Sequence, residues 1–481
     1  MSTTLGELLR DVATVPVDVP VSGMTEDSRR VRPGDVFVAV RGATADGHAF
    51  AADAAARGAV AVLAEHPLPG LAVPVMVVPE LRARRGALAA RLHREPGRSL
   101  YCVGVTGTNG KTSIAHYLAD LATRLGMPAG YLGTIGWGRI GELQPVRLTT
   151  EDPLTVQARL AALRDQGSAW AVLEASSHAL AQDRIVDVPF RAAVFSNLSR
   201  DHLDYHATPD DYAIAKSRLF RWPGLELAVL NTDDPFGRHL RSTLPAGVDC
   251  VTYGRYGADV RWTGVDFSSG QALGRWQTLW GEAPLCLAVQ APFSVANVAA
   301  AMAVLCARGF AVRDVADAAR ALTPVPGRME RFSAPHRPTV VVDFAHTPDA
   351  LEKVLCALRA ATAGRLICVF GCGGDRDPGK RPLMAAAAER HADVLWLTSD
   401  NPRSEDPEQI IADMRTGLTG RVPAHEHADR RAAIEAALTT AAEHDVVLVA
   451  GKGHEDYQEI AGVRRSFSDR AVVADLMGEA R

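Results

Sequence analysis

The chain has 481 residues, which at roughly 150 residues per domain predicts about three domains. Hydrophobic residues make up 47% of the sequence, so each domain can bury a core of ordinary size. The formal net charge is only −4 with acids and bases interspersed, which argues against a protein that coats nucleic acid or lies on a membrane surface.

The seven cysteines are scattered and match no zinc-site spacing, so we expect reduced thiols in a cytoplasmic protein. The N-terminus lacks the charged-then-apolar pattern of a signal peptide. The most apolar segment, residues 291–307, is interrupted by Ser294 and Asn297 and is too short for a membrane span. We therefore expect a buried helix there and no membrane insertion.

Residues 1–97 are predicted to form a small α/β domain. Apolar runs at 35–40, 59–65 and 73–78 indicate strands with helical segments between them. A charged helical segment ends at Pro96 and leads into the next domain.

Residues 98–325 are predicted to form the second domain. Its first apolar strand runs into a glycine-rich loop and then a helix, and further strands are expected at 170–176, 192–199 and 227–234. Strands that alternate with helices predict a mostly parallel sheet. The stretch around 250–290 alternates polar and apolar residues and indicates an antiparallel appendage.

Residues 326–481 are predicted to form a third α/β domain. The segment 322–332 contains two prolines and a glycine and is the expected linker. The strands expected in this domain lie at 339–345, 365–371, 392–399 and 445–451.

The segment "VTGTNGKTS" (105–113) has the composition of a phosphate-binding loop. Its glycines let backbone N–H groups turn toward a phosphate, and the following helix adds its dipole. Lys111 would place its charge on the outer phosphates, and Thr112 could offer its hydroxyl to Mg²⁺. The general pattern needs a glycine where Val105 stands, so the loop is a shortened one.

Acidic and imidazole side chains follow the next two predicted strands. Glu174 lies near the end of one, and Asp201, His202, Asp204 and His206 lie just beyond the other. Ligands collect at the carboxyl ends of parallel strands, and these side chains suit Mg²⁺ bound to nucleotide phosphates. A solvated polar loop is the alternative interpretation.

Seven segments, in order, resemble motifs of the Mur ligases, the ATP-dependent amide-forming enzymes of peptidoglycan precursor synthesis. They are TGTNGKT, EASSHAL, NLSRDHLDYH, YAIAKSRLF, VPGRMER, DFAHTPDAL and GGDRDPGKRP. The resemblance covers essentially the whole chain. It implies a UDP-sugar-binding domain (1–97), a central phosphate-loop ATPase domain (98–325) and a C-terminal Rossmann-like amino-acid-binding domain (326–481).

The resemblance also implies roles for individual residues. ATP would be bound by Gly107, Thr108, Asn109, Gly110, Lys111, Thr112, Ser113, Asn297, Arg328 and Asp343. The UDP-MurNAc-dipeptide would be bound by Ser28, Thr149, Thr150, Ser176, Gln182 and Arg184. The catalytic residues would be Lys111, Glu174, His202 and Lys216. The magnesium ligands would be Thr112, Glu174, His202 and Lys216, the last as a carbamate.

Lys216 is ambiguous on its own, because a lysine on an apolar helix face most often reaches solvent. Three positions depart from the family pattern, namely Glu26, Leu148 and Ser294. They leave open a paralogue that uses a modified nucleotide sugar.

The turn "TSDNPRSEDP" (398–407) follows a predicted buried strand and suits a small zwitterion. The planar guanidinium of Arg403 can hold a carboxylate with two parallel hydrogen bonds, and Pro402 fixes the turn. Glu455, after another strand, offers an acid to an ammonium group. In the resembling family this motif marks enzymes that bind meso-diaminopimelate, here through Arg376, Asp400, Asn401, Pro402, Arg403, Gly451 and Glu455.

The implied reaction joins meso-diaminopimelate to UDP-N-acetylmuramoyl-L-alanyl-D-glutamate through an acyl phosphate. The partners would be these small molecules, without nucleic acid, and we expect a monomer with hinges near residues 97 and 325. The alternatives are a related ligase with another amine or nucleotide-peptide, a folylpolyglutamate synthase, or a phosphate-loop switch that hydrolyses ATP.

Overall fold

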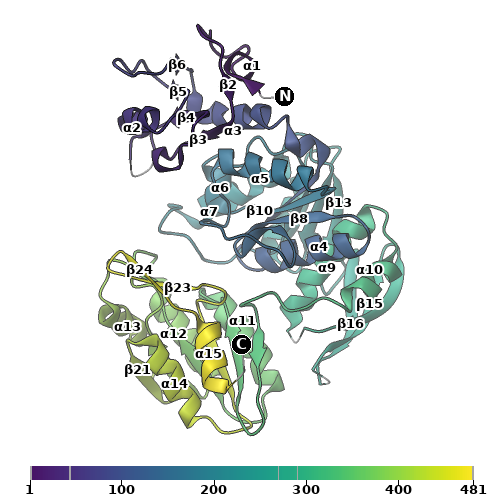
Figure 1. Ribbon diagram of the computed structural model, residues 1–481. Coiled ribbons are helices and arrows are strands. Elements are labelled where there is room, and N and C mark those ends of the chain that lie inside the picture. Colours follow the sequence, from purple (N-terminus) through teal and green to yellow (C-terminus); the bar gives the residue numbers. More distant parts are fainter. Residues whose placement is uncertain (1–2, 43–44, 269, 290, 479–481) are drawn as a thin grey trace. The chain divides into compact units, whose positions relative to one another are not determined.

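The computed structural model describes residues 3–42, 45–268, 270–289 and 291–478 (Figure 1). The chain divides into two compact units. The first comprises Met1–Gly104, Gly126–Ala193 and Arg221–Glu226. The second comprises Val105–Leu125, Val194–Phe220 and Leu227–Arg481.

The N-terminal part contains a four-stranded parallel sheet in the order β3-β4-β5-β6. Its strands are β3 (Gly23–Thr25), β4 (Asp35–Ala39), β5 (Ala61–Ala64) and β6 (Val75–Val77), and a two-stranded sheet pairs β1 (Thr3–Thr4) with β2 (Pro20–Val21). The helices are α1 (Leu5–Leu8), α2 (Ala51–Ala56) and α3 (Leu81–Leu92). The three strands predicted from the apolar runs are confirmed as β4, β5 and β6.

The middle of the chain contributes a ten-stranded sheet in the order β16-β15-β14-β13-β12-β11-β7-β10-β8-β9. Its strands are β7 (Tyr101–Thr106), β8 (Ala129–Gly133), β9 (Gly136–Arg139), β10 (Trp170–Glu174), β11 (Phe190–Phe195), β12 (Leu227–Asn231), β13 (Asp249–Tyr253), β14 (Val260–Asp266), β15 (Ala272–Thr278) and β16 (Gly281–Leu287). The strands β14, β15 and β16 pair antiparallel, which confirms the predicted appendage.

The helices of this region follow standard start signals. They are α4 (Lys111–Arg124), α5 (Pro153–Asp165), α6 (Ser177–Ala181), α7 (Pro209–Ser217), α8 (Pro235–Ser242), α9 (Pro292–Ala307) and α10 (Val312–Ala319). Asp152 caps α5 and Thr208 caps α7, each followed by proline at the first helical position. The apolar segment predicted as a buried helix is confirmed as α9, whose residues from Val298 to Cys306 are all buried.

The C-terminal region forms a six-stranded sheet in the order β17-β18-β22-β19-β20-β21. Its strands are β17 (Glu330–Phe332), β18 (Thr339–Asp343), β19 (Leu366–Phe370), β20 (Val394–Thr398), β21 (Ala424–His427) and β22 (Val446–Ala450). All except β17 are parallel, so the four strands predicted here are confirmed. A separate hairpin pairs β23 (Tyr457–Ile460) with β24 (Val463–Ser466).

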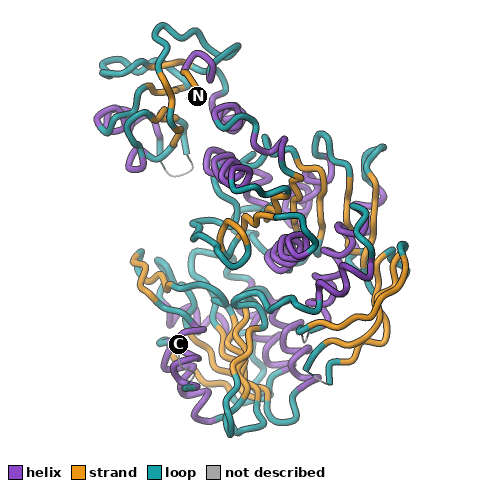
Figure 2. The backbone as a smooth tube through the Cα atoms, turned by 45° about the vertical axis from the view of Figure 1, so that its right-hand side comes forward, coloured by secondary structure: helices purple, strands orange, loops and turns teal. Residues whose placement is uncertain are grey.

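Helices cover both faces of this sheet (Figures 1 and 2). The helices α11 (Pro348–Ala361), α12 (Lys380–His391) and α13 (Pro407–Arg415) pack on one face. The helices α14 (Arg430–Thr440) and α15 (Asp469–Met477) pack on the other. Because both faces are buried, the strands are nearly continuous apolar runs, which is why the sequence revealed them.

A fully buried ion pair joins the two helices of that second face. Arg430 donates from Nε and Nη2 to the two oxygens of Asp469, each at 2.7 Å. We expect Asp469→Ala to destabilise this domain by about 3–5 kcal/mol, because the guanidinium stays buried without its counter-charge. Thermal unfolding should show this, and a loss no larger than that of an exposed pair such as Arg431–Asp475 would contradict it.

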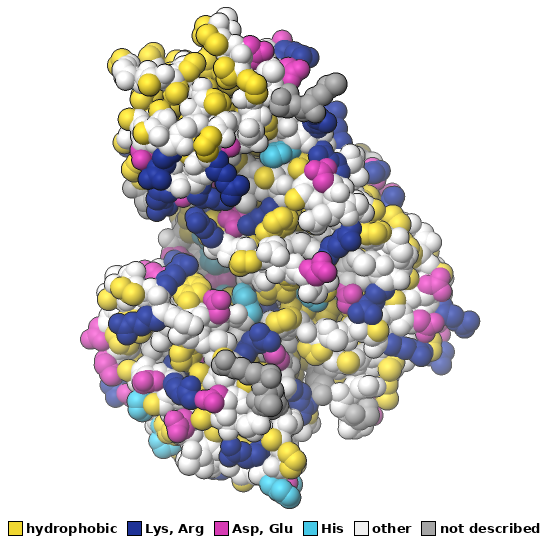
Figure 3. Space-filling model, in the orientation of Figure 1, with side chains coloured by type: hydrophobic (Ala, Val, Ile, Leu, Met, Phe, Trp, Pro, Cys, Tyr) yellow, Lys and Arg dark blue, Asp and Glu magenta, His cyan; other side chains and the backbone are white. Residues whose placement is uncertain are grey.

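The surface carries charges of both signs. On the face shown in Figure 3, lysines, arginines and acidic side chains occur on all parts of the molecule. No helix in the described part of the chain is long and apolar enough to cross a lipid bilayer.

Candidate active site

The loop after β7 has the backbone of a phosphate-binding loop. Gly107 and Gly110 have φ of +141° and +86°, in the region that favours glycine. A Cβ on Gly107 would collide with the Ser196 hydroxyl, and one on Gly110 would lie 2.7 Å from Asn297 Oδ1. Helix α4 begins directly at Lys111, so its free N–H groups face the loop.

Lys111 folds back over this loop. Its Nζ donates to Gly107 O at 2.9 Å and to Thr108 O at 2.8 Å. The ammonium group of Lys111 is held beside the backbone N–H groups of this loop, so its charge lies where a bound phosphate would lie.

The segment after β11 supports the loop from the side. Asn197 Oδ1 accepts from Asn109 N at 3.1 Å, and Asn197 Nδ2 donates to Asn109 O at 3.0 Å. Thr108 Oγ1 lies 3.1 Å from the hydroxyl of Tyr212, on helix α7. These contacts hold the loop against the segment after β11 and helix α7.

Residues of the chain beyond 325 also reach the loop. Arg328 Nη2 donates to Thr112 Oγ1 at 3.1 Å, and Asn109 Nδ2 donates to Asp349 Oδ2 at 3.0 Å. Asp343 accepts from the backbone N–H of Met329 at 2.7 Å, which fixes the turn that carries Arg328. The structure therefore brings the predicted ATP residues Asn297, Arg328 and Thr112 to one loop.

Lys216 is buried, with 1% of its surface exposed, rather than extended into solvent. Its Nζ donates to Gly107 O at 2.8 Å and lies 4.4 Å from the centre of the Tyr212 ring. Burial, reinforced by the nearby charge of Lys111, lowers the pKa of Lys216 well below its ordinary value. The ambiguity of this residue is thus resolved in favour of a buried amine beside the phosphate loop.

His202 and Asp201 follow β11, and His202 has a left-handed backbone with φ of +55°. His202 Nε2 lies 3.3 Å from Asp201 Oδ2, and His346 Nε2 lies 3.8 Å from the same oxygen. Burial opposes ionisation of Asp201, but hydrogen bonding from His346 and the charges of both histidines hold its pKa well below the usual range. The result is a fixed carboxylate next to an imidazole.

Within the first unit, Glu174 is the centre of a hydrogen-bonded network. Glu174 Oε1 accepts from Tyr131 Oη at 2.6 Å, and from Thr134 N at 2.8 Å. Thr134 Oγ1 donates to Thr149 Oγ1 at 3.1 Å, and Thr150 Oγ1 donates to Glu174 O at 2.6 Å. Tyr131 and Thr134 were missed by the sequence analysis, since neither lies in a recognisable motif.

The network continues to the predicted peptide-binding residues. Ser176 N donates to Thr150 Oγ1 at 3.2 Å, and Arg184 Nη1 donates to Thr150 O at 2.9 Å. Arg184 Nε donates to Gln182 Oε1 at 2.9 Å. Five of the six residues predicted to bind the nucleotide-peptide therefore lie in one connected network.

Ser28, the sixth, lies in the turn Ser28–Arg30 of the N-terminal part and is buried. Its hydroxyl hydrogen-bonds Asp53 and helps to lower the pKa of that carboxyl. Nearby, burial raises the pKa of Glu26 to about 7, although its Oε1 lies 3.1 Å from Arg85 Nε. The unusual acid at position 26 is thus easier to protonate than an ordinary glutamate.

The predicted amine-binding residues lie in loops that follow β19, β20 and β22 of the C-terminal sheet. Arg403 Nη1 donates to Gly374 O at 2.6 Å, and a Cβ on Gly373 would lie 3.0 Å from that same nitrogen and 3.7 Å from Arg376 Cγ. Arg403 and Arg376 therefore border the same glycine turn. Arg376 Nη1 also lies 3.6 Å from Asp204 Oδ2.

The backbone of Arg403 is held in an unusual conformation, with φ of +53°. Its N–H donates to Glu459 O at 3.0 Å, and its carbonyl accepts from Ala461 N at 2.6 Å. These two bonds attach the arginine to the β23–β24 hairpin, which fixes where its guanidinium can reach.

The acids of this region surround a lysine that the sequence analysis missed. Lys452 Nζ lies 2.8 Å from Glu455 Oε2 and 3.6 Å from Asp400 Oδ1. Gly451 has φ of +119°, and a Cβ there would lie 2.7 Å from Asp400 Oδ2, so only glycine permits this approach. Burial alone would raise the pKa of Asp400, but the charges of Lys452 and Arg430 lower it.

The side chains near the phosphate loop can be compared with the ligands that magnesium prefers. Among the residues that the structure describes, no three His, Cys, Asp or Glu side chains converge on one metal position. An amine at Lys216 would not bind Mg²⁺, whereas a carbamate there would offer oxygens of the kind that Mg²⁺ prefers. By their chemistry, the oxygens of Thr112 and of a carbamylated Lys216 suit magnesium.

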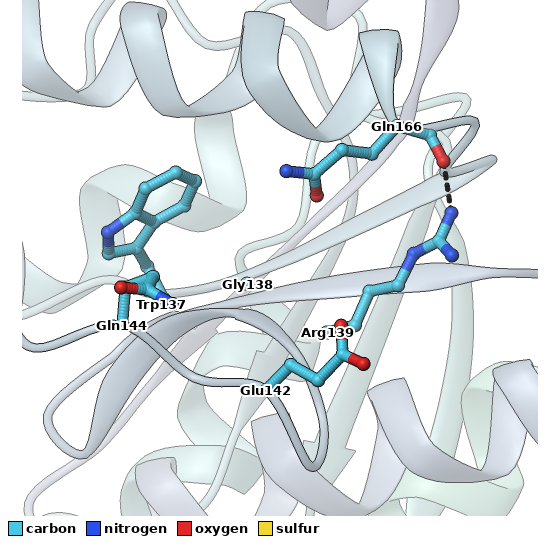
Figure 4. Close-up of a pocket in the computed structure, with 6 residues that line it drawn as sticks. All are labelled: Trp137, Gly138, Arg139, Glu142, Gln144 and Gln166. Carbon is cyan, nitrogen blue, oxygen red and sulfur yellow. Dashed lines mark hydrogen bonds between the residues drawn. The ribbon is translucent and has the colours of Figure 1, made fainter.

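A surface cavity of about 400 Å³ lies elsewhere, beside β9 (Figure 4). It is lined by Trp137, Gly138, Arg139, Glu142, Gln144 and Gln166. Arg139 donates to the backbone carbonyl of Gln166 there. None of the predicted site residues lines this cavity.

Comparison with known proteins identifies related chains along nearly the full length. Three family models match the chain. The model described as "Mur ligase family, catalytic domain" matches residues 20–91, the "Mur ligase middle domain" model matches 105–305, and the "Mur ligase, glutamate ligase domain" model matches 327–453. UDP-N-acetylmuramoyl-L-alanyl-D-glutamate–2,6-diaminopimelate ligase of Chromobacterium violaceum is 48% identical, covering 95% of this chain and 94% of its own. The same-named ligase of Pseudomonas aeruginosa is 46% identical, covering 94% of each chain.

Comparison with solved structures gives the same family. A UDP-N-acetylmuramoyl-L-alanyl-D-glutamate–2,6-diaminopimelate ligase superposes with a TM-score of 0.69 at 38% identity, covering 99% of both chains. MurF ligase from Thermotoga maritima, solved with ADP, shares the fold with a TM-score of 0.67 at 20% identity, covering 95% of this chain and 96% of its own. With near-complete coverage by relatives well above 30% identity, the chain belongs to the Mur ligase family.

Proposed function

We propose that this enzyme is an ATP-dependent ligase that adds meso-diaminopimelate to UDP-N-acetylmuramoyl-L-alanyl-D-glutamate in peptidoglycan precursor synthesis. The observation that carries the proposal is the arrangement of Arg403, Arg376, Asp400 and Glu455 at the carboxyl edge of one sheet. Two guanidinium groups suit a carboxylate, and the acids suit an ammonium group. The two ligases compared above are named for UDP-N-acetylmuramoyl-L-alanyl-D-glutamate and 2,6-diaminopimelate.

The reaction begins with transfer of the γ-phosphoryl group of ATP to the γ-carboxylate of D-glutamate. The amine of the incoming amino acid attacks the acyl phosphate, and phosphate leaves as the amide forms. Both early reactants are anions that repel each other, so the main task of the protein is to position them and neutralise charge. Lys111 and the N–H groups of the 107–110 loop perform this task for the phosphates.

We assign the remaining residues as follows. Thr149, Thr150, Ser176, Gln182 and Arg184 hold the peptide part of the nucleotide-peptide, and Ser28 contributes on the uridine side. Asn297, Arg328 and Asp343 lie around ATP, with Ser113 in the first turn of α4. Thr112, Glu174, His202 and the Lys216 carbamate would hold magnesium, which would supply charge neutralisation for the phosphates.

Three further assignments belong to this proposal. The enzyme works in the cytoplasm and acts as a monomer. Its three functional domains are 1–97, 98–325 and 326–481. The three family matches fall inside these ranges.

The amine preference tests the substrate directly. We expect Arg403→Ala to lower kcat/KM for meso-diaminopimelate by about a hundredfold, because a carboxylate left unpaired in the site costs roughly 3 kcal/mol. The kcat/KM for L-lysine, which has no distal carboxylate, should fall much less. Steady-state kinetics with both amines and both proteins measures the change in preference.

A matched control removes an arginine of the same domain away from the loops. Arg415, on α13, pairs with Glu426 at 3.2 Å, and Arg415→Ala should leave the preference unchanged. If Arg403→Ala instead lowers kcat/KM for both amines equally, Arg403 supports the turn and does not bind the distal carboxylate.

Phosphate release separates the ligase from a phosphate-loop switch. A ligase should release phosphate only when ATP, the nucleotide-peptide and the amine are all supplied. Turnover of ATP without either acceptor would favour the switch.

A further inference from the structure

Lys452, which follows Gly451 at the end of β22, has no role in the assignments above. Its side chain is fully buried, at 0% exposed. Its Nζ lies 2.8 Å from Glu455 Oε2, 3.1 Å from Asn401 Oδ1 and 3.6 Å from Asp400 Oδ1. An ammonium group has three donors, and here they face three side chains assigned to the amine substrate.

Glu455 is held through only one of its oxygens. Its Oε2 accepts from Lys452 Nζ and, at 2.9 Å, from Asn401 Nδ2. Its Oε1 makes no hydrogen bond with another residue in the described part of the chain, and the side chain is 20% exposed. A carboxylate fixed in this way keeps the lone pairs of the second oxygen for an incoming donor.

Lys452 is the cation that the two acids of this cluster share. Its Nζ lies 2.8 Å from Glu455 Oε2 and 3.6 Å from Asp400 Oδ1. Its charge acts on Asp400 more strongly than the charges of Arg430, His346 and Lys380. Removing this charge would leave both carboxylates less compensated, and Glu455 would lose the cation that holds its Oε2.

We propose that Lys452 is a positioning residue that sets selectivity for the distal ammonium group of the amine substrate. Lys452 acts through Glu455, because it fixes Oε2 so that Oε1 meets the ligand. The inference rests on the proposed function, because it concerns the amine of that same reaction.

A purely structural ion pair makes a different prediction. If Lys452 only stabilised the fold, its loss would lower the use of every amine by a similar factor. A residue that aligns Glu455 with an ammonium group affects only amines that carry that group. Selectivity between two matched amines therefore separates the two roles.

The experiment compares meso-diaminopimelate with 2-aminopimelate, which keeps both carboxylates and lacks the distal amine. Wild type should prefer meso-diaminopimelate. In Lys452→Met, which keeps the length of the side chain, the ratio of the two kcat/KM values should fall by about tenfold, as expected for the loss of one charge-assisted hydrogen bond. The change should appear in KM for meso-diaminopimelate, with KM for ATP unchanged.

A double-mutant cycle tests whether the effect passes through Glu455. Glu455→Gln should lose the same preference, and Lys452→Met/Glu455→Gln should lose no more than Glu455→Gln alone. Because the double variant removes two opposite charges together, it can still be measured if Lys452→Met alone does not fold. A further tenfold loss in the double variant would overturn the proposal.

The matched control is Arg365→Met. Arg365 Nη2 pairs with Asp445 Oδ2 at 2.7 Å on the same sheet, at the amino ends of β19 and β22, so this variant should keep the wild-type ratio. An unchanged ratio in Lys452→Met refutes the role of Lys452 alone. A wild-type enzyme that ligates neither amine refutes the proposed function instead.

Discussion

Replacing Lys111 by alanine is expected to abolish ligation, with kcat falling by about a hundredfold to a thousandfold. The Nζ of Lys111 lies between Gly107 O and Thr108 O, 2.9 and 2.8 Å away, so its charge is fixed at the loop before ATP arrives. A preorganised donor at a developing negative charge contributes roughly 2.7–4 kcal/mol to the transition state. Phosphate release and product mass would both report the loss.

Helix α4 offers a control for that variant. Arg124 lies in its last turn and pairs with Asp120 at 2.8 Å, far along the helix from the loop. Arg124→Ala should keep nearly full activity. A loss smaller than about tenfold in Lys111→Ala would be hard to reconcile with charge stabilisation by this lysine.

Lys216→Ala is the second variant with a large expected effect, and it should be nearly inactive. Carbon dioxide reacts with a neutral amine, forming an N–C bond and releasing a proton to give the carbamate. Burial and the charge of Lys111 lower the pKa of Lys216, which favours that neutral form at neutral pH. In the proposed mechanism, this carbamate would supply oxygens to magnesium.

Small carboxylic acids provide the specific test of this role. The alanine variant leaves a space beside Gly107 O, where formate or acetate can replace the carbamate oxygens. We expect partial recovery of ligation in Lys216→Ala with millimolar formate and none in Lys111→Ala. A fully active Lys216→Ala enzyme would remove the lysine from the mechanism.

The order of strands and loops could be predicted from the sequence, because each strand is a buried apolar run that ends in a distinctive polar turn. The phosphate loop, the DNPR turn and Glu174 all occupy such ends, and the structure places them there. Local patterns predict this much, since they depend on residues that are adjacent in the chain.

Features that depend on distant residues were not predictable in the same way. Lys452 lies in a charged turn, "AGKGHED", where a lysine is normally solvated. Its burial is caused by Asp400 and Asn401, which precede it by about fifty residues. Tyr131 likewise gains its role only when β8 and β10 pair in parallel and bring it to Glu174.

The attachment of Arg403 to the β23–β24 hairpin has an evolutionary consequence. The backbone of Arg403 is hydrogen-bonded to Glu459 O and Ala461 N. Its left-handed conformation is equally unfavourable for alanine and for lysine. An insertion or deletion in the hairpin would therefore displace Arg403 without replacing it, because the two are joined through the backbone.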